Sequence, residues 1–244
     1  MNKLCLLVFT WSFSCLSYST SITIVTEQLP PYNYQENGVM KGMSTEVVQA
    51  VLQELDLEIP IEVYPWARAY RMASAIENVL IYSISRIPQR EASFKWIGVI
   101  APVSFGVFAL KKRTDIKADS LNGLRPYKLG TVQGDALDQY FTKKGFTNIV
   151  KSNSKEVSMK MFLMGRSDIW SVSKQTGVYL LKKAGISPNE SVREILKLKE
   201  FSAGNQYMAF SLATKDKVVN QFKEALKSIK KKGFYQNIIK KYEI

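Results

Sequence analysis

The sequence predicts an α/β protein of two lobes, because three features of the chain point to two sheets covered by helices. Strand-like and helix-like patterns alternate over residues 21–85, which favours a mostly parallel sheet flanked by helices. The same alternation restarts near residue 105 and continues to residue 212. Extended segments near both ends of this second unit indicate that the chain passes between the lobes twice.

The elements of the first unit follow from hydrophobic periodicity. Apolar residues alternate with polar ones in strands and recur every three or four residues in helices. Val47, Val48 and Val51 have the helical spacing, and Ser44 or Thr45 is available as the helix cap. The sequence therefore predicts strands over residues 21–25, 59–63 and 79–85, and helices beginning near residue 45 and covering residues 67–76.

The second unit repeats this alternation, and the chain ends in two helices. Asp135 and Ser154 are expected to cap two helices of this unit, since their side chains accept hydrogen bonds from the first helical N–H groups. The pattern places lobe 1 at residues 20–107 and 205–244, and lobe 2 at residues 108–204. The expected strands cover residues 105–110, 128–132, 149–150, 168–172, 193–198 and 207–212, and the expected helices end near residues 145, 165, 184, 231 and 242.

The first residues predict a secretory signal peptide over residues 1–19. Lys3 is followed by a short apolar run and then by small residues, which is the pattern of a cleaved leader. The run is shorter than the roughly 20 apolar residues that span a membrane. The alternatives are an uncleaved anchor and lipidation of Cys15, but residues 12–14 lack the leucine of a lipobox. A periplasmic location is therefore expected.

The composition excludes several kinds of site. The chain has no histidine, and Cys5 and Cys15 lie in the expected leader, which excludes structural zinc and Ser-His or Cys-His catalysis in the mature chain. No metal, cofactor or nucleic acid is expected to bind, and a monomer is expected. The net charge is +13, and residues 215–244 hold nine lysines. We interpret these lysines as a solvated helix face, with contact to an anionic membrane surface as the alternative.

Arg90 and two serines form a candidate carboxylate site. Ser83 and Ser85 alternate at the end of a predicted strand, so their hydroxyl groups point to one face. Arg90 follows five residues later, and a guanidinium group pairs bidentately with a carboxylate. The alternative is a surface arginine beside Glu91.

Three further residues lie where a ligand cleft is expected. Trp66 and Arg68 follow the predicted strand over residues 59–63, and ligands of open α/β sheets gather beyond the carboxyl ends of strands. Trp66 would form a wall of the pocket, and Arg68 would meet an anionic group. The alternative for Trp66 is the hydrophobic core. Glu27 would receive a ligand cation or be solvated.

Four stretches of the chain, in this order and spacing, resemble one protein family. They are residues 26–32 with 41–43, 65–69, 83–91, and 130–135 with 165–168. Together they resemble the bacterial extracellular solute-binding protein family 3, the polar amino-acid-binding type. The resemblance implies a type II periplasmic-binding fold, in which each lobe is a mixed, mostly parallel sheet and the ligand cleft lies between the lobes. It also implies that Arg90 holds the ligand's carboxylate. The other candidate ligand contacts are Glu27, Tyr32, Gln133, Asp135 and Ser173.

The second lobe departs from the family pattern at two positions. The family usually has Ser or Thr where this chain has Asp135, and often has Asp where this chain has Ser173. A neutral hydroxyl cannot replace the charge-assisted bond that a carboxylate makes with an ammonium group, and Lys174 would add positive charge if it turned inward. The expected ligand is therefore not an ordinary α-amino acid, unless Asp135 or Asp168 replaces the missing acid.

These features predict a solute-binding protein and not an enzyme. It would capture a small polar or anionic, carboxylate-bearing, amino-acid-like ligand and serve an inner-membrane ABC permease or a sensor. One alternative is a dehydratase-like enzyme on the same fold, for which Glu27, Asp135 and Asp168 are the available acids. The other is an orphan sensor domain without a transporter.

Overall fold

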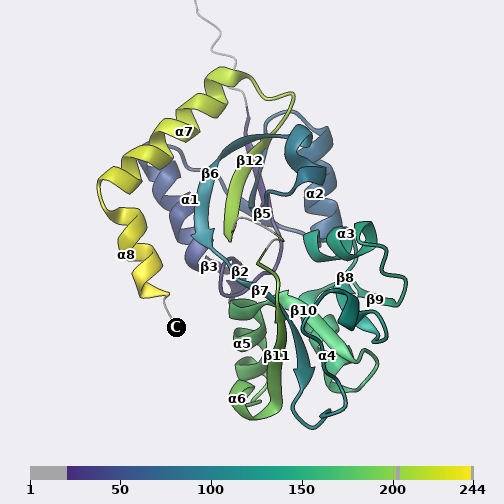
Figure 1. Ribbon diagram of the computed structural model, residues 1–244. Coiled ribbons are helices and arrows are strands. Elements are labelled where there is room, and N and C mark those ends of the chain that lie inside the picture. The colour runs from purple at the N-terminus through teal and green to yellow at the C-terminus, as the bar shows by residue number, and fades with distance from the viewer. Residues whose placement is uncertain (1–20, 200, 202–203, 243–244) are drawn as a thin grey trace, which may run out of the picture.

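The computed structural model describes residues 21–199, 201 and 204–242, and within them the strands form two five-stranded sheets and one two-stranded hairpin (Figure 1). The expected signal peptide, with Cys5 and Cys15, lies outside the described residues. In Figure 1 the two large sheets lie one above the other, each with its own helices. Within this described part of the chain, every helix is too short or too polar to span a lipid bilayer.

The first sheet has the order β4-β1-β5-β12-β6 and mixed directions. Strand β1 runs parallel to β4 and β5, whereas β12 runs antiparallel to β5 and β6. Ile24 and Leu80 pack on one face, and their neighbours Val25 and Ile81 pack on the other, because helices cover both faces. The strands are β1 (Thr23–Thr26), β4 (Ile61–Val63), β5 (Val79–Ser85), β6 (Phe94–Pro102) and β12 (Asn205–Ser211).

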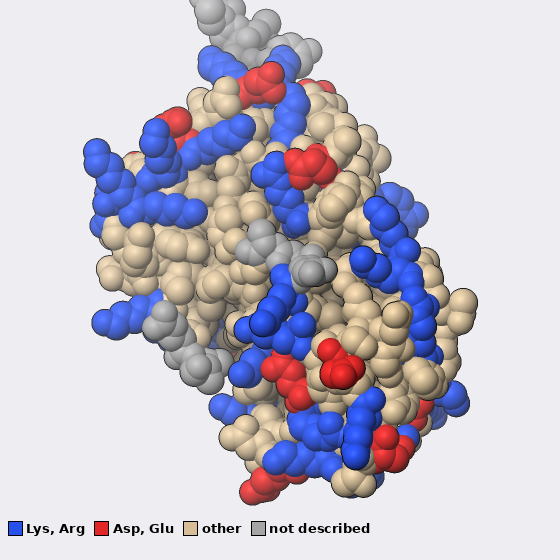
Figure 2. All heavy atoms as spheres, viewed as in Figure 1, with Lys and Arg blue, Asp and Glu red and all other residues tan. Residues whose placement is uncertain are grey.

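Four helices flank this sheet. Helix α2 (Trp66–Ala75) packs on the face that contains Val25 and Ile81, whereas α1 and α7 pack on the opposite face. The lysines near the C-terminus lie on exposed faces of the last two helices, as expected, and Figure 2 shows basic side chains gathered over this region. The remaining helices are α1 (Met43–Glu54), α7 (Asp216–Lys231) and α8 (Phe234–Lys241).

The second sheet has the order β11-β7-β10-β8-β9. Strand β8 runs parallel to β9 and β10, and β7 runs antiparallel to β10 and β11. Two apolar clusters fill the space between this sheet and its helices. The elements are β7 (Phe105–Leu110), β8 (Leu129–Val132), α3 (Ala136–Lys143), β9 (Ile149–Ser152), α4 (Lys155–Leu163), β10 (Ile169–Ser173), α5 (Lys174–Lys183), α6 (Pro188–Ser191), β11 (Val192–Lys197) and a 3₁₀ turn, Asn122–Leu124.

We define lobe 1 as the elements of the first sheet and lobe 2 as those of the second. The expected boundary at residues 107–108 falls inside β7, all of which pairs with β10 and β11. The first crossing therefore lies between Pro102 and Phe105, three residues earlier than expected, because the whole of β7 pairs with strands of the second sheet. The second crossing lies between β11 and β12, and β12 begins at Asn205, where the sequence placed the return to lobe 1.

Three strands were missed by the sequence pattern. Strand β6 carries a nearly continuous apolar run with Lys95 and Gly98 inside it, so it lacks a clear alternation. A β-carbon on Gly98 would lie 2.9 Å from Leu226 Cδ2, so this glycine lets α7 approach the sheet closely. The other two strands, β2 (Tyr34–Glu36) and β3 (Val39–Lys41), form a short hairpin beside α1.

Helix α1 begins differently from the expectation. Ser44 and Thr45 are buried inside the helix and do not cap it. Instead, the N–H groups of Met43 and Ser44 donate to the backbone carbonyls of Pro31 and Tyr32, at 3.0 and 2.8 Å. The preceding loop thus satisfies the orphan donors of the helix. This close approach requires Gly42, whose φ is +112°.

We predict that Gly42→Ala destabilises the protein by at least roughly 1–3 kcal/mol, since its backbone conformation is essentially restricted to glycine. An added β-carbon would also lie 2.5 Å from the Tyr32 carbonyl oxygen. Gly38→Ala is the matched control, because Gly38 also has positive φ, +78°, but open space around it. Urea unfolding of both variants measures the difference. Equal losses of stability would contradict this account of the helix start.

Candidate functional site

The ends of parallel strands bring the candidate residues together. Glu27 follows β1, Trp66 follows β4, and Ser83 and Ser85 lie at the end of β5. In lobe 2, Asp135 follows β8 after a short turn. These positions place polar side chains beyond the carboxyl ends of both sheets, where open α/β folds bind ligands.

A small cavity between the lobes collects these side chains. Its volume is about 40 Å³, which exceeds the roughly 10–15 Å³ that a buried water molecule needs on this measure. A second cavity of about 600 Å³ shares Glu27 and Trp66 with it and adds residues of the β9–α4 turn. The lining of the small cavity is Glu27, Leu29, Trp66, Ser83, Ser85, Arg90, Phe105, Asp135, Ala136, Leu137, Lys155, Ser173 and Gln206.

Arg90 is the most deeply buried charged group of the cavity, with 1% of its surface exposed. Its guanidinium donates over long distances, from Nη1 to the Ser85 carbonyl (3.5 Å) and from Nη2 to the Gly134 carbonyl (3.4 Å), while Nε has no partner among the described residues. Burial lowers the pKa of Arg90 to about 10. The group therefore keeps hydrogen-bonding capacity for an acceptor that enters the cavity.

Aromatic rings and a turn of 3₁₀ helix hold Arg90 in place. Residues 88–93 form this turn, and the guanidinium carbon lies 4.9 and 5.1 Å from the ring centroids of Trp66 and Tyr70. The alternative of a surface arginine beside Glu91 fits Arg86, which forms an exposed ion pair with Glu91. The structure therefore places Arg90 inside the cleft and Arg86 at the surface.

Ser83 and Ser85 line the cavity on the same side as Arg90. Ser83 has a positive φ of 59°, and the pairing of β5 with β12 shifts register opposite it. Its hydroxyl oxygen is buried without a partner among the described residues. A buried hydroxyl group without a partner is unfavourable, so this group also has capacity to bind an incoming polar atom.

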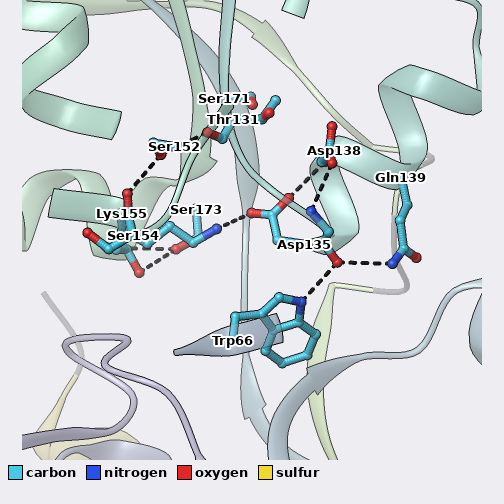
Figure 3. A network of polar contacts seen from close by, with 12 residues as sticks. Trp66, Thr131, Asp135, Asp138, Gln139, Ser152, Ser154, Lys155, Ser171 and Ser173 are labelled. Atoms are coloured by element: carbon cyan, nitrogen blue, oxygen red, sulfur yellow. Dashed lines mark hydrogen bonds and ion pairs between the residues drawn. The ribbon is translucent and has the colours of Figure 1, made fainter. Parts of the chain in front are cut away.

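Asp135 and Lys155 form a buried ion pair in lobe 2 (Figure 3). Their side chains are only 8% and 9% exposed, and Asp135 also accepts from the Asp138 N–H at 2.8 Å as the cap of α3. Burial lowers the pKa of Lys155, but the Asp135 and Glu27 carboxylates outweigh it, so the pKa lies above its ordinary value. The predicted cap is confirmed. Sequence reasoning missed Lys155, although Ser154, the predicted cap of α4, immediately precedes it.

Glu27 contributes the second carboxyl group of the cavity. It is 8% exposed and also lines the larger cavity. Burial raises its pKa to about 7, with a smaller opposing effect of Lys155 and further raising effects of Asp135 and Glu156. The Glu27 carboxyl group therefore exchanges its proton near neutral pH.

Ser173 lies in the cavity but is already engaged. Its hydroxyl accepts from the Thr176 N–H at 3.2 Å and donates to Thr176 Oγ1 at 2.8 Å, which caps α5. Lys174 is exposed, and its backbone N–H donates to the Ser104 carbonyl. Lys174 thus does not turn into the cleft, and the buried cation of lobe 2 is Lys155.

One carbonyl oxygen joins the lobes across the cavity. Trp66 Nε1 donates to the Gly134 carbonyl at 2.9 Å, as Figure 3 shows. Gln139 Nε2 donates to the same oxygen at 3.0 Å, and Arg90 does so at 3.4 Å. Trp66 is therefore a buried residue that also lines the cavity. The two interpretations of this residue, a core residue and a wall of the pocket, do not exclude each other.

Three predicted site residues do not line the cavity. Arg68 is exposed, and its guanidinium carbon lies 4.0 Å from the ring centroid of Tyr64, because α2 directs it outward. Gln133 is also exposed, and its backbone N–H donates to the Ser152 carbonyl. Tyr32 is fully buried and donates from its hydroxyl to the Pro102 carbonyl at 3.1 Å, which ties the Pro-Pro loop to β6.

Comparisons with known proteins agree with this architecture. A family model described as bacterial extracellular solute-binding proteins, family 3, matches residues 22–243. A probable amino-acid-binding protein, YxeM of Bacillus subtilis (strain 168), is 23% identical over 223 residues, which cover 89% of this chain and 81% of the relative.

Two solved structures confirm the predicted two-lobed periplasmic-binding fold. A histidine kinase sensor domain with similarity to periplasmic binding proteins superposes with a TM-score of 0.79 at 16% identity, covering 91% of this chain and 95% of that one. An ancestral arginine-binding protein bound to arginine has a TM-score of 0.77 at 18% identity, covering 91% and 97%. At these identities the likeness concerns the fold alone.

The raised pKa of Glu27 predicts a pH dependence of stability. Between pH 4.5 and about 7 the folded protein holds a proton on Glu27 that the unfolded chain has released. Stability from this residue therefore falls as pH rises through that window, by up to about 3 kcal/mol, and stays low above it. Glu27→Gln should remove this decline, so the variant should exceed the wild type in stability at pH 8 but not at pH 4.5.

Chemical denaturation at both pH values measures this difference. Glu91→Gln is the control, since Glu91 is exposed and its hydrogen bonds from Arg86 hold its pKa below the ordinary value. This variant should keep the wild-type decline. The same decline in wild type and Glu27→Gln would show that Glu27 remains ionised in the folded protein.

Proposed function

The chain belongs to the bacterial extracellular solute-binding proteins of family 3, and from this premise we propose that it captures a small carboxylate-bearing solute between its lobes. The observation that supports this ligand class is that Arg90 is buried without an ion-pair partner. None of the described carboxylates forms an ion pair with this arginine, which is 1% exposed. Asp135 and Glu27 attract the guanidinium group electrostatically, but a buried charge without a directly paired counter-charge is unfavourable, and a ligand carboxylate would supply that direct partner.

The geometry around Arg90 suits a carboxylate in particular. A guanidinium group offers parallel N–H donors that match the two oxygens of a carboxylate. Nε and the weakly engaged Nη atoms supply such donors here. The unpartnered Ser83 hydroxyl lines the same cavity and would give a further hydrogen bond.

The larger cavity beside Glu27 and Trp66 has room for the rest of the ligand. The small cavity at Arg90 fits a few atoms, whereas the adjoining cavity of about 600 Å³ extends past Glu27 and Trp66. We infer that the carboxylate enters first and that the remainder lies towards Tyr64 and Glu156, which line the larger cavity. Closure would bury the ligand through the contact of Trp66 with Gly134.

The proposed physiological setting is the periplasm. Residues 1–19 would be cleaved as a signal peptide, and the mature protein would act as a monomer that delivers its solute to an ABC permease. One structural relative is the substrate binding protein of an amino acid ABC transporter. The histidine kinase sensor domain, in contrast, supports a second role in which ligand-driven closure is reported to a sensor.

An enzyme remains a second candidate because of Glu27. A carboxyl group with a pKa of about 7 inside a cavity has the property that general acid-base catalysis uses. Binding without chemistry predicts that a solute incubated with the protein is recovered unchanged, as followed by NMR. Conversion of the solute that is lost in Glu27→Gln would instead establish a dehydratase-like enzyme.

We predict that Arg90→Ala weakens the binding of a carboxylate solute by about 2–5 kcal/mol, the usual loss when one partner of a buried charge pair is removed. A thermal-shift screen of small acids and amino acids identifies a solute, and calorimetry then compares the variants. Arg86→Ala is the matched control, because Arg86 lies on the same segment but pairs with Glu91 at the surface. Equal affinity of Arg90→Ala and wild type would refute the carboxylate role.

A further inference from the structure

The Lys155 ammonium group is an unusual component of this cavity. Lys155 is the first residue of α4, yet its side chain is only 9% exposed and turns onto Asp135 (Figure 3). A lysine at the start of a helix opposes the helix dipole, and burial of its charge adds a desolvation cost. The ion pair with Asp135 offsets both costs, so the two residues act as one unit.

Because of this ion pair, the Asp135 carboxylate of lobe 2 is not available to a ligand. Asp135 is the lobe 2 carboxylate that lines the small cavity, and its oxygens are engaged by Lys155 and by the Asp138 N–H. The Ser173 hydroxyl, which also lines the cavity, is engaged by Thr176. Lobe 2 therefore presents no free anion to a ligand cation at this place, and presents an ammonium group instead.

The charges that line the cavity also disfavour a ligand ammonium group beside Lys155. Its ionisable lining consists of Arg90, Lys155, Asp135 and Glu27. With Asp135 held by Lys155, Arg90 and Glu27 remain for the ligand, and Glu27 is itself partly protonated near neutral pH because burial raises its pKa. A second ammonium group beside Lys155 would meet a like charge in a poorly hydrated space, which is unfavourable.

We propose that Lys155 is a specificity-determining residue that neutralises Asp135 and makes the cleft select small acids lacking an α-ammonium group over the corresponding α-amino acids. This inference rests on the proposed function, because the ligand's carboxylate must lie at Arg90. The substrate class is then a 2-oxo, 2-hydroxy or dicarboxylic acid. An amine further along the ligand would instead reach Glu27, which lines both cavities.

The test uses pairs of acids that differ at the α-position alone, namely 2-oxoglutarate with L-glutamate and L-lactate with L-alanine. Calorimetry on the wild type should show tighter binding of the amine-free member by about tenfold or more. Lys155→Met keeps an unbranched side chain but removes the charge and frees Asp135. This variant should reverse the preference, since a ligand ammonium can then replace the lysine.

Three further variants separate this role from a structural one. Lys155→Arg keeps the charge and should keep the wild-type preference. The double variant Lys155→Met, Asp135→Asn also removes the carboxylate that Lys155→Met exposes. It should therefore bind amino acids more weakly than Lys155→Met alone. Lys151→Met is the control, because Lys151 is 43% exposed, pairs with Asp138 at 3.0 Å and does not line the cavity.

The outcomes distinguish this inference from the proposed function. Tighter binding of L-glutamate or L-alanine by the wild type, no binding of either amine-free acid, or an unchanged preference in Lys155→Met overturns the inference. If binding still depends on Arg90 in those experiments, the proposed carboxylate site stands. Binding that is indifferent to Arg90→Ala overturns the proposed function instead.

Discussion

Charged side chains buried between the two lobes lose their water, and the arrangement of this site follows from how each charge is compensated. Lys155 and Asp135 compensate each other within lobe 2. Glu27 reduces the cost by holding a proton part of the time near neutral pH, since burial raises its pKa to about 7. Arg90 has neither solution, because a guanidinium group stays charged and its described contacts are long hydrogen bonds and aromatic rings. Arg90 is therefore the charged residue of the cavity that lacks a direct partner, and a ligand carboxylate can provide one.

The fold explains why these charges meet. Parallel strands of both sheets end at the cleft, and the segments after them carry Glu27, Trp66 and Asp135. Two helices of lobe 2, α3 and α4, begin at the cavity with Asp135 as a cap and Lys155 as a first residue. A cap must lie at a helix start, so capping and the proposed ligand selection would use the same carboxylate. This shared use ties the stability of α3 to the chemistry of the cleft.

Sequence patterns predicted those parts of the site that depend on strand periodicity and helix capping. The strand that carries Ser83 and Ser85 and the cap at Asp135 follow from periodicity and capping chemistry, and both agree with the structure. Arg68 and Gln133 were placed by motif position, but their directions depend on helix phase and turn geometry, which point both outward. Lys155 was missed because nothing in its neighbourhood predicts burial of a lysine. The parallel pairing of β8 with β9 brings the starts of α3 and α4 together, and with them Asp135 and Lys155.

The contact across the cleft has a consequence for closure. The Gly134 carbonyl oxygen accepts from Trp66, Gln139 and Arg90, although such an oxygen has two lone pairs. Arg90 makes the longest of these bonds and is the donor with the most to gain from another acceptor. A carboxylate beside it would take over the guanidinium and leave Trp66 and Gln139 with Gly134. Because Arg90 and Ser83 both belong to lobe 1, the carboxylate alone does not distinguish an open from a closed arrangement. The ligand would favour the closed state only through additional contacts with lobe 2, since a ligand shifts a conformational equilibrium by its differential affinity for the two states.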